Sequence, residues 1–398
     1  MANVSSSNGI EKCPKLRFNG FSNTWTFQSA ESLFENVTDK NHPEETVLTI
    51  IQGSGTLPRG ESSRNIRYDE SGIANYKKVQ THDYIIHLRS FEGGLEMANS
   101  TGIISPAYTV LRPKEKVAPL FYDAYFHTDE FINHILAKSV EGIRDGRQIS
   151  YEAFKWLKIP TCSFEEQSKI AELFRVLAIR INKQRELVST LKKYKRGATN
   201  NIFNGYTFNE SVKECLLSDV ASFHQGLTYS PGDVSDMGYL VMRSSNIQNG
   251  RLSFRDNVYV KSRISESLLV QENDVLMCVR NGSKQLVGKT AIIDQAYPNM
   301  TWGAFMMIIR STLKNTFVYH YLNSDSFYNQ VFRDSGTATI NQITKGTLNE
   351  CKLFIPNSEQ QERICQYLDL LDRKLHKEED YLENLRLLKQ SLLQKLFI

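Results

Sequence analysis

The sequence predicts an α+β protein built from two copies of one unit, in which each copy ends in a long helix and the two helices pack together as a coiled coil. Three observations support this prediction: a repeat of about half the chain length, a heptad pattern that closes each copy, and short β-rich runs in both globular parts. The 398 residues are 40% hydrophobic and 23% charged. This composition suits a globular protein of two or three domains and excludes disordered, collagen-like and disulfide-scaffold classes.

The internal repeat is visible when residues 121–160 are aligned with residues 317–356 without a gap. In this stretch, nine residues of the first copy are identical in the second: Phe121, Tyr125, Asp129, Phe131, Asn133, Ser139, Leu157, Ile159 and Pro160. After a two-residue shift the match continues, with Gln167, Ile170, Leu177, Lys183, Leu191, Lys195 and Phe203 recurring as Gln361, Ile364, Leu371, Lys377, Leu385, Lys389 and Phe397. Two copies of one unit therefore fill the chain.

Each copy closes with a helix start signal. An Ile-Pro pair ends an extended run, because a residue before proline avoids the α region. Ser163 with Glu166, and Ser358 with Gln361, then have the spacing of a capping box. We expect globular domains at 1–158 and 207–352, and helical segments at 159–206 and 353–398.

Apolar residues at heptad positions predict one seam on each helix, and neither seam is expected to stay exposed. The seam residues are Ile170, Leu177, Gln184 and Leu191 in the first helix and Ile364, Leu371, Glu378 and Leu385 in the second. The same pattern adds Leu173, Leu187, Tyr194, Tyr367, Tyr381, Leu388 and Leu392. The polar residues Gln184 and Glu378 occupy matching positions, either as a buried pair that sets the register or as two solvated side chains.

Short β-rich runs and one short helix are predicted in each globular part. The predicted strands are Val47–Ile51, Tyr84–Leu88, Ala107–Leu111, Asp274–Val279 and Phe305–Ile309, and the short helices are Asp129–Lys138 and Asp325–Arg333.

No feature of the sequence predicts secretion or membrane insertion. The apolar stretches are far shorter than the ~20 residues that span a bilayer, and the first residues contain no apolar signal core. The six cysteines (Cys13, Cys162, Cys215, Cys278, Cys351, Cys365) are widely scattered, which predicts reduced thiols in a cytoplasmic protein. The net charge of +4 is too small to establish a nucleic-acid partner by itself.

A strong catalytic motif is also missing. The sequence has neither GxxxxGK[ST] nor HExxH, and Gly53-Ser54-Gly55 is better explained as a plain turn than as a dinucleotide loop. The histidines His82, His87, His127 and His134 lack the spacing of a metal site. Asp334, Glu350 and Lys352 match the spacing of a metal-dependent nuclease only loosely and are interpreted as surface charge. We expect a non-catalytic protein without a cofactor or metal of its own.

The sequence offers binding chemistry instead. Hydroxyls, amides and arginines on Gly-containing turns suit phosphate and base-edge contacts, since arginine can bond guanine bidentately and Asn or Gln can do so with adenine. The candidate DNA contacts are Arg59, Arg64, Arg67, Arg144, Arg147 and Gln148 in the first copy, and Arg243, Asn246, Arg280, Asn281, Ser283, Lys284, Thr337, Thr339, Asn341 and Gln342 in the second.

Three groups of residues resemble one known family. The run from Pro14 to Phe21, followed by Trp25, is similar to a shared family opening. The segment from Asp274 through Arg280-Asn281-Gly282-Ser283 to Gly288 is similar to the middle of a target recognition domain. The two segments that begin Ile159-Pro160 and Ile355-Pro356 are similar to helical conserved regions. Together with the duplication, these segments resemble the specificity subunit (HsdS) of type I restriction–modification systems over the whole chain.

The resemblance implies two target recognition domains joined by two long antiparallel helices with pseudo-twofold symmetry. Each domain would bind one half of a split sequence in double-stranded DNA, and the helices would set the spacer. Two methyltransferase subunits would dock on the chain, with restriction or translocase subunits joining in some systems, and no membrane would be involved. S-adenosylmethionine, ATP and Mg²⁺ would be bound only by those partners.

Two other functions stay open. The globular parts together are close to neutral, whereas DNA-binding domains usually carry a basic excess. This charge balance supports a duplicated helical scaffold that binds proteins without DNA specificity. A nearer alternative is the recognition subunit of a related system whose partner combines methylation and cleavage.

Overall fold

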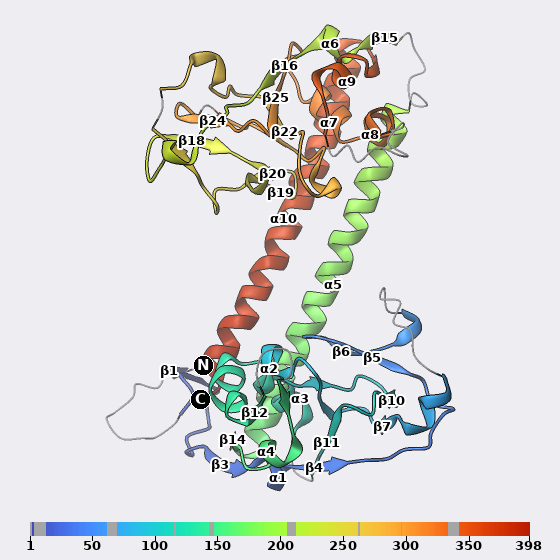
Figure 1. Cartoon of the computed structure of the whole chain (residues 1–398), viewed down its shortest axis with the longest axis vertical. Coiled ribbons are helices and arrows are strands. Elements are labelled where there is room, and N and C mark those ends of the chain that lie inside the picture. Colours follow the sequence, from blue (N-terminus) through green and yellow to red (C-terminus); the bar gives the residue numbers. More distant parts are fainter. Residues whose placement is uncertain are drawn as a thin grey trace. The chain divides into compact units, whose positions relative to one another are not determined.

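Figure 1 shows the computed structural model of the chain, which describes residues 2–3, 13–61, 70–114, 117–142, 147–204, 212–261, 263–295, 297–332 and 342–398. The chain forms two compact units. Unit 1 comprises Met1–Arg185 and Asp380–Ile398, and unit 2 comprises Glu186–Glu379. Two long helices, α5 (Phe164–Phe203) and α10 (Ser358–Leu396), each contribute one segment to either unit.

The starts of both long helices follow from short polar residues. Ser163 accepts a hydrogen bond from the backbone N–H of Glu166 at 3.3 Å, as the sequence predicts. The Glu166 carboxylate does not return to the cap, however, because it pairs with Arg17. For α10 the predicted cap is wrong by one residue. Asn357 accepts from the N–H of Gln360 at 2.9 Å, and Ser358 is already helical.

Unit 1 is built on one four-stranded antiparallel sheet in the order β4-β11-β8-β9, with smaller ribbons around it. Its strands are β1 (Ala2–Asn3), β2 (Leu16–Arg17), β3 (Thr26–Ser29), β4 (Phe34–Val37), β5 (Leu48–Ile51), β6 (Gly55–Pro58), β7 (Lys77–Val79), β8 (Tyr84–Ile86), β9 (Glu96–Met97), β10 (Gly102–Ile104), β11 (Thr109–Pro113), β12 (Val140–Glu141), β13 (Gln148–Ile149) and β14 (Lys158–Thr161). Its short helices are α1 (Ala30–Leu33), α2 (Ser90–Gly93), α3 (Pro119–Phe126), a π-helix over Glu130–Ile135, a 3-10 turn over Leu136–Ser139, and α4 (Tyr151–Phe154).

Unit 2 repeats this sheet in the order β16-β25-β22-β23 and adds a second, mixed sheet in the order β17-β21-β18-β24. Its strands are β15 (Lys213–Leu216), β16 (Ala221–Gln225), β17 (Val234–Ser235), β18 (Tyr239–Met242), β19 (Ile247–Gln248), β20 (Arg251–Leu252), β21 (Tyr259–Val260), β22 (Val275–Cys278), β23 (Thr290–Ile292), β24 (Met300–Trp302), β25 (Met306–Ser311) and β26 (Lys352–Ile355). Its short helices are α6 (Leu217–Val220), α7 (Phe317–Leu322), α8 (Asp325–Phe332) and α9 (Lys345–Asn349).

The central strand β22 shows why the sheet residues form an unbroken apolar run. Val275 and Met277 pack into a core with α7, α10 and the end of α5, whereas Leu276 and Cys278 pack into a second core with β18 and β24. Successive side chains of a strand point to opposite faces, so a strand covered on both faces needs apolar residues throughout.

The end of each long helix is buried in the unit opposite to the one where that helix begins. Phe203 closes α5 and packs in unit 2 against Phe317 and Tyr321, with ring centroids 5.2 and 5.8 Å away. Its repeat partner Phe397 follows α10 and packs in unit 1 against Phe121 and Tyr125 at 5.2 and 5.6 Å. The two contacts join equivalent positions of the repeat, so the fold repeats in a circular order that links the last residues of the chain to the first domain.

The two long helices run antiparallel where they touch. In unit 2 the Tyr194 hydroxyl hydrogen-bonds that of Tyr367 at 2.9 Å, and Lys195 forms an ion pair with Asp372. In unit 1 the ring of Phe174 stacks on that of Phe397 at 6.0 Å.

The eight principal seam residues named from the sequence are all buried or half-buried. Five further residues from the heptad pattern lie largely outside, at 36% to 56% exposure: Leu187, Tyr194, Tyr367, Tyr381 and Leu388. Their places are taken by Phe174, Ile181, Val188, Leu368, Leu375 and Leu382, which are buried. An α-helix has 3.6 residues per turn, so a strict seven-residue repeat drifts around its surface along 40 residues.

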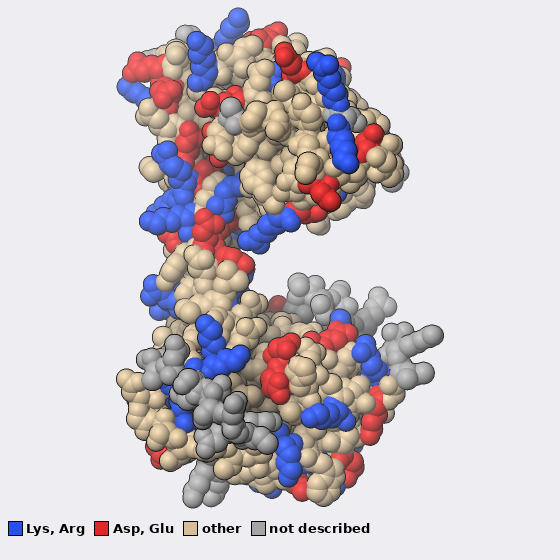
Figure 2. Space-filling model, turned by 90° about the vertical axis from the view of Figure 1, so that its left-hand side faces the viewer, with Lys and Arg blue, Asp and Glu red and all other residues tan. Residues whose placement is uncertain are grey.

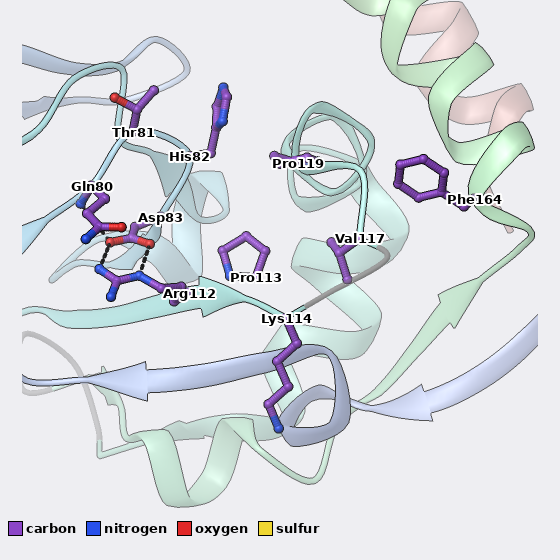
Figure 3. Close-up of a pocket in the computed structure, with 10 residues that line it drawn as sticks. All are labelled: Gln80, Thr81, His82, Asp83, Arg112, Pro113, Lys114, Val117, Pro119 and Phe164. Carbon is purple, nitrogen blue, oxygen red and sulfur yellow. Dashed lines mark hydrogen bonds and ion pairs between the residues drawn. The ribbon is translucent and has the colours of Figure 1, made fainter.

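An ion pair between a buried aspartate and a half-buried arginine is present at one end of the main sheet in both units. In unit 1, Arg112 donates two hydrogen bonds to Asp83, at 2.9 and 2.8 Å, and in unit 2 Arg310 donates two to Asp274 at 2.7 Å each. The residue before each aspartate has a positive φ, 76° at His82 and 67° at Asn273. In unit 1 this pair lines a hollow of about 520 Å³ (Figure 3), which lies at the start of β8.

The predicted strands correspond to β5, β8, β11, β22 and β25, with ends shifted by one or two residues. The predicted helix over residues 129–138 is a π-helix followed by a 3-10 turn, and the second predicted helix is α8. Helices α3 and α7 were not predicted. Both are buried on nearly every side, so neither shows the polar face that marks a helix in sequence.

Candidate nucleic-acid interface

Three of the predicted polar groups of unit 2 lie together at the end of β22. The turn after this strand contains Arg280 and Asn281, and the Asn281 amide donates to the Ser244 hydroxyl at 3.2 Å. This bond ties the turn to the segment after β18. On the other side, Arg280 forms an isolated β-bridge with Gln342. Gln342 and the next residue, Ile343, lie just before α9. The structure therefore brings together segments that are about 40 and 60 residues apart in sequence.

The turn is held by its own backbone and by local side-chain bonds. The Asn281 side-chain oxygen accepts from the N–H of Ser283 at 3.0 Å, and the N–H of Ile343 donates to the carbonyl of Val279 at 2.7 Å. Arg280, Ser283 and Lys284 are exposed. A fixed backbone that presents exposed donors is suited to contacts with base edges and phosphates.

Two candidates after β18 have different roles. Asn246 is fully buried, and its amide accepts from the N–H of Arg243 at 2.9 Å while donating to the carbonyls of Ser253 and Asp256. Its side chain holds the turn and offers nothing to a ligand, so its prediction as a base contact is corrected. Arg243 is half-exposed and forms an ion pair with Asp256 at 2.9 Å.

Unit 1 brings equivalent segments together at the end of β8. Arg147 lies over the ring of Phe91 in α2, with 4.2 Å from its guanidinium carbon to the ring centroid. Gln148 and Ile149 precede α4 just as Gln342 and Ile343 precede α9, and hydroxyl side chains, Ser150 and Thr344, cap these helices. Arg147 and Gln148 are both exposed.

A hairpin lies beside this cluster in unit 1. An added Cβ on Gly93 of α2 would lie 1.6 Å from the side-chain nitrogen of Gln52, so the hairpin β5–β6 and α2 are in close contact. Arg59 follows this hairpin, half-buried, with its Nε 3.4 Å from the Thr49 hydroxyl. Of the remaining candidates, Arg64, Arg67, Arg144, Thr337, Thr339 and Asn341 lie outside the described residues.

The hairpin turn is anchored by a buried carboxylate. Glu96 accepts from the N–H groups of Gly53 and Gly55 at 2.5 and 2.8 Å, and its other neighbour is His127 Nε2 at 3.4 Å. Burial lowers the pKa of His127, but the hydrogen bond to Glu96 and the charges of Asp123 and Glu96 outweigh this and raise it to about 9. His127 is therefore an imidazolium at neutral pH and balances the charge of Glu96.

The sequence analysis missed Arg89, although the repeat contains the signal. Asp83 and Asp274 are structural equivalents, and Arg89 and Arg280 each follow their aspartate by six residues. Arg89 is 68% exposed and pairs with Glu92. Sequence reasoning also missed the aromatic residues Phe91 and Phe305 as members of these clusters: Phe91 lies in a helix of only four residues, and the sequence pattern places Phe305 in the strand that begins one residue later.

The surface charges are mixed. Figure 2 shows Lys and Arg interspersed with Asp and Glu on the visible face of each unit, without a single basic patch. Within the described parts of the chain, no three His, Cys, Asp or Glu side chains gather to hold a metal ion. Of the nuclease-like trio, Asp334 lies outside the described residues, and Lys352 forms an ion pair with Glu214 at 2.9 Å. No helix among those described is both long and apolar enough to cross a bilayer.

Part of the chain is similar to known proteins of one class. Residues 209–384 match the family described as the type I restriction modification DNA specificity domain. The specificity subunit of the type I restriction enzyme StySPI from Salmonella potsdam is 29% identical over 165 residues, and that of EcoKI from Escherichia coli K12 is 30% identical over 163 residues. Each alignment covers 39% of this chain and 35% of the relative, so the chain matches about a third of the length of these curated relatives.

Solved structures agree at the level of the fold. The type I restriction–modification S subunit from M. genitalium aligns with a TM-score of 0.62 and 16% identity, over 97% of this chain and 99% of that one. A chain from a structure on complex assembly and conformational transition of the type I system aligns with a TM-score of 0.53 and 17% identity, over 94% and 97%. These comparisons support the resemblance seen in the sequence to type I restriction–modification specificity subunits, and the match to the family model lies within residues 209–384.

Proposed function

We propose that this chain selects the DNA sequence for a type I restriction–modification complex, with each unit binding one half of a bipartite target in double-stranded DNA. One observation carries this proposal: both units bring the same two segments, the turn after the central strand and the Gln-Ile pair before a short helix, to the same end of the same sheet. A duplicated frame with different polar residues at its exposed end suits two related sites that recognise different sequences.

The proposed DNA contacts are the exposed and half-exposed members of these clusters. They are Arg89, Arg147 and Gln148 in unit 1 and Arg243, Arg280, Asn281, Ser283, Lys284 and Gln342 in unit 2. Arg59 remains a candidate beside the hairpin. The face of each unit seen in Figure 2 mixes basic and acidic side chains, which supports a model in which partner subunits supply much of the phosphate contact.

The long helices are the proposed docking elements for two methyltransferase subunits. In unit 2 they enclose a hollow of about 570 Å³ lined by Tyr194, Ala198, Ile364 and Tyr367, among others. Tyr194 and Tyr367 are 56% and 39% exposed, and aromatic residues of this kind are common anchors at protein interfaces. The partners would supply adenine methylation with S-adenosylmethionine, and restriction subunits, where present, ATP-driven translocation and Mg²⁺-dependent cleavage.

The helices are also proposed to set the number of unread base pairs between the half-sites. At 1.5 Å per residue, α5 is about 60 Å long, an upper bound on the separation it can set. An added Cβ on Gly197 in α5 would meet no atom within 4 Å, so the helix has space around this position. Inserting one or two helical turns there is expected to lengthen the spacer, and an unchanged spacer in an active assembly would contradict this role.

The test is methylation mapping by single-molecule sequencing of DNA from cells that express the partner methyltransferase with or without this chain. We expect modified adenines in one split motif that appears only when the chain is present. The absence of any motif, with the partner shown to be assembled and active, would favour a scaffold without DNA specificity.

A further inference from the structure

An exposed aromatic side chain stands inside the polar cluster of unit 2. Phe305 is 58% exposed and is the third residue of a four-residue turn, Gly303–Met306, which is closed by a 2.8 Å hydrogen bond from the N–H of Met306 to the carbonyl of Gly303. Large apolar side chains in such positions usually mark a contact surface when polar groups surround them.

The backbone that carries Phe305 is fixed from two sides. Its carbonyl accepts hydrogen bonds from the N–H groups of Val279 and Arg280, at 3.0 and 3.2 Å. On the other side, the Gln225 amide donates to the carbonyl of Ala304 at 2.7 Å. An added Cβ on Gly226 would lie 2.1 Å from the Gly303 carbonyl oxygen, so the two backbones are in direct contact. The ring is therefore presented on a rigid turn, which limits the entropy lost on binding.

The neighbours of the ring are the proposed base contacts. The guanidinium carbon of Arg280 lies 5.3 Å from the ring centroid, and Arg280 is bridged to Gln342. A cation–π contact of this kind orients both groups toward the same surface. An arginine and an apolar ring side by side match two adjacent features of the major groove, the O6 and N7 acceptors of guanine and the C5-methyl group of thymine.

We propose that Phe305 is a specificity-determining residue of unit 2 that contacts a thymine methyl group in the major groove, beside a base pair recognised by Arg280. This inference rests on the proposed function and deepens it. Thymine is selected because it alone among the four DNA bases carries a methyl group in that groove. Adjacent base pairs are about 3.4 Å apart along the axis, so two side chains in contact can reach neighbouring pairs.

The proposed contact belongs to one half-site only. In each unit the arginine of the Asp–Arg pair gives a fixed reference, Arg112 in unit 1 and Arg310 in unit 2. Five residues before it, unit 2 has Phe305 and unit 1 has Ala107. The equivalent position of unit 1 therefore lacks a ring, and a change at Phe305 is expected to leave the other half-site unaltered.

The first arm of the test compares methylation maps of the full complex containing Phe305→Ala, Phe305→Leu or the unchanged chain. Phe305→Ala is expected to remove the requirement for thymine at one position of one half-site, and Phe305→Leu to keep it, because leucine retains an apolar contact. Phe354→Ala is the matched control. Phe354 is another exposed phenylalanine of unit 2, with 39% exposure, but it lies on β26. An unchanged motif in Phe305→Ala would overturn the inference.

The second arm deletes the methyl group from the DNA. Replacing that thymine by deoxyuridine in a synthetic duplex is expected to weaken binding by the unchanged complex about fourfold, the effect of one buried methyl group, and to leave binding by Phe305→Ala unchanged. Equal weakening of both complexes would overturn the inference, because the methyl group would then be contacted elsewhere. A thymine requirement without any effect of deoxyuridine would also overturn it, in favour of a wedge between base steps. An unchanged chain that yields no motif at all would instead contradict the proposed function.

Discussion

The two units share a frame and differ in what they attach to it. Both have an Asp–Arg pair at the start of the central strand. Each also buries the phenylalanine at the end of the long helix that begins in the other unit, Phe397 in unit 1 and Phe203 in unit 2. Both place a Gln-Ile pair beside the turn that follows the central strand. These repeated features hold the sheet and the helices together, whereas the polar residues on the exposed turns differ.

The anchoring of the long helices shows a second difference. In unit 1 the start of α5 is held by a buried ion pair, Arg17 with Glu166, at 2.6 Å, and the Trp25 indole also donates to Glu166. In unit 2, α10 is held about three turns from its start, where His320 and Thr316 hydrogen-bond Asp369 at 2.8 and 3.0 Å. The two long helices are therefore fixed by different polar chemistry at different positions, and each buried charge needs a partner.

The largest expected effect tests the circular order of the repeat. Phe203→Ala and Phe397→Ala each remove a buried ring that is 5% exposed, so each is expected to cost about 3–5 kcal/mol of stability. The loss should appear in different units: Phe397→Ala should increase amide exchange in residues 13–185, and Phe203→Ala in residues 212–379. Hydrogen exchange measured by mass spectrometry checks this.

Leu388→Ala is the control for this pair, because Leu388 lies on α10 but is 49% exposed. It is expected to change exchange little. If both phenylalanine variants loosened the same unit, the circular order would be wrong.

A somewhat smaller effect is expected from the ion pair that unit 1 alone has. Glu166→Gln introduces the residue type that unit 2 has at the equivalent position, Gln360, but leaves Arg17 buried without its charged partner. We expect a loss of about 3 kcal/mol in the free energy of unfolding. Urea denaturation followed by far-UV circular dichroism measures it.

The double variant Arg17→Met with Glu166→Leu is expected to recover most of this stability, because it removes both buried charges. A double variant as unstable as Glu166→Gln would show that packing, rather than an unpaired charge, causes the loss.

The smallest expected effect is a pH dependence confined to unit 1. The pKa of His127 is raised to about 9, so the stability from its pairing with Glu96 is complete below the ordinary value near 6.5 and is lost as pH rises through about 9. Unit 2 uses a neutral pair near the equivalent place, with Thr290 donating to Asn323 at 3.0 Å. Between pH 7 and 9.5 the amides of Gly53 and Gly55 should lose protection after correction for intrinsic exchange.

His127→Asn should abolish this pH dependence by giving unit 1 the residue that unit 2 has. Equal loss of protection in the variant would mean that another group near the hairpin titrates.

Much of the frame could be predicted from the sequence, because repetition and periodicity report on packing. The matches of Phe203 with Phe397 and of Lys195 with Lys389 identified the duplication, and the Ile-Pro pairs located the helix starts. The heptad pattern failed for Tyr194 and Tyr367, because burial along these helices also depends on where the globular domains pack. The Asp–Arg pairs are separated by 29 and 36 residues, and no local pattern connects them.

The candidate interface was only partly predictable. Residue chemistry selected Arg147 and Arg280, but their proximity to Phe91 and Phe305 depends on turns joined by long-range backbone contacts. Asn246 looked like a base contact because amides suit adenine, yet its burial assigns it to the turn. Sequence reports which groups can bond a base, whereas only the fold shows whether they face solvent.

The most direct test of the central claim is a pair of methylation maps for Arg147→Ala and Arg280→Ala, each in the full complex. Both residues are exposed members of equivalent clusters, and loss of a base-specific arginine contact is expected to cost about 1–3 kcal/mol of discrimination. The account predicts that Arg147→Ala relaxes one half-site and Arg280→Ala the other, each leaving its opposite half intact. Relaxation of the same half-site by both variants, or unaltered motifs in both, would contradict the assignment of one half-site to each unit.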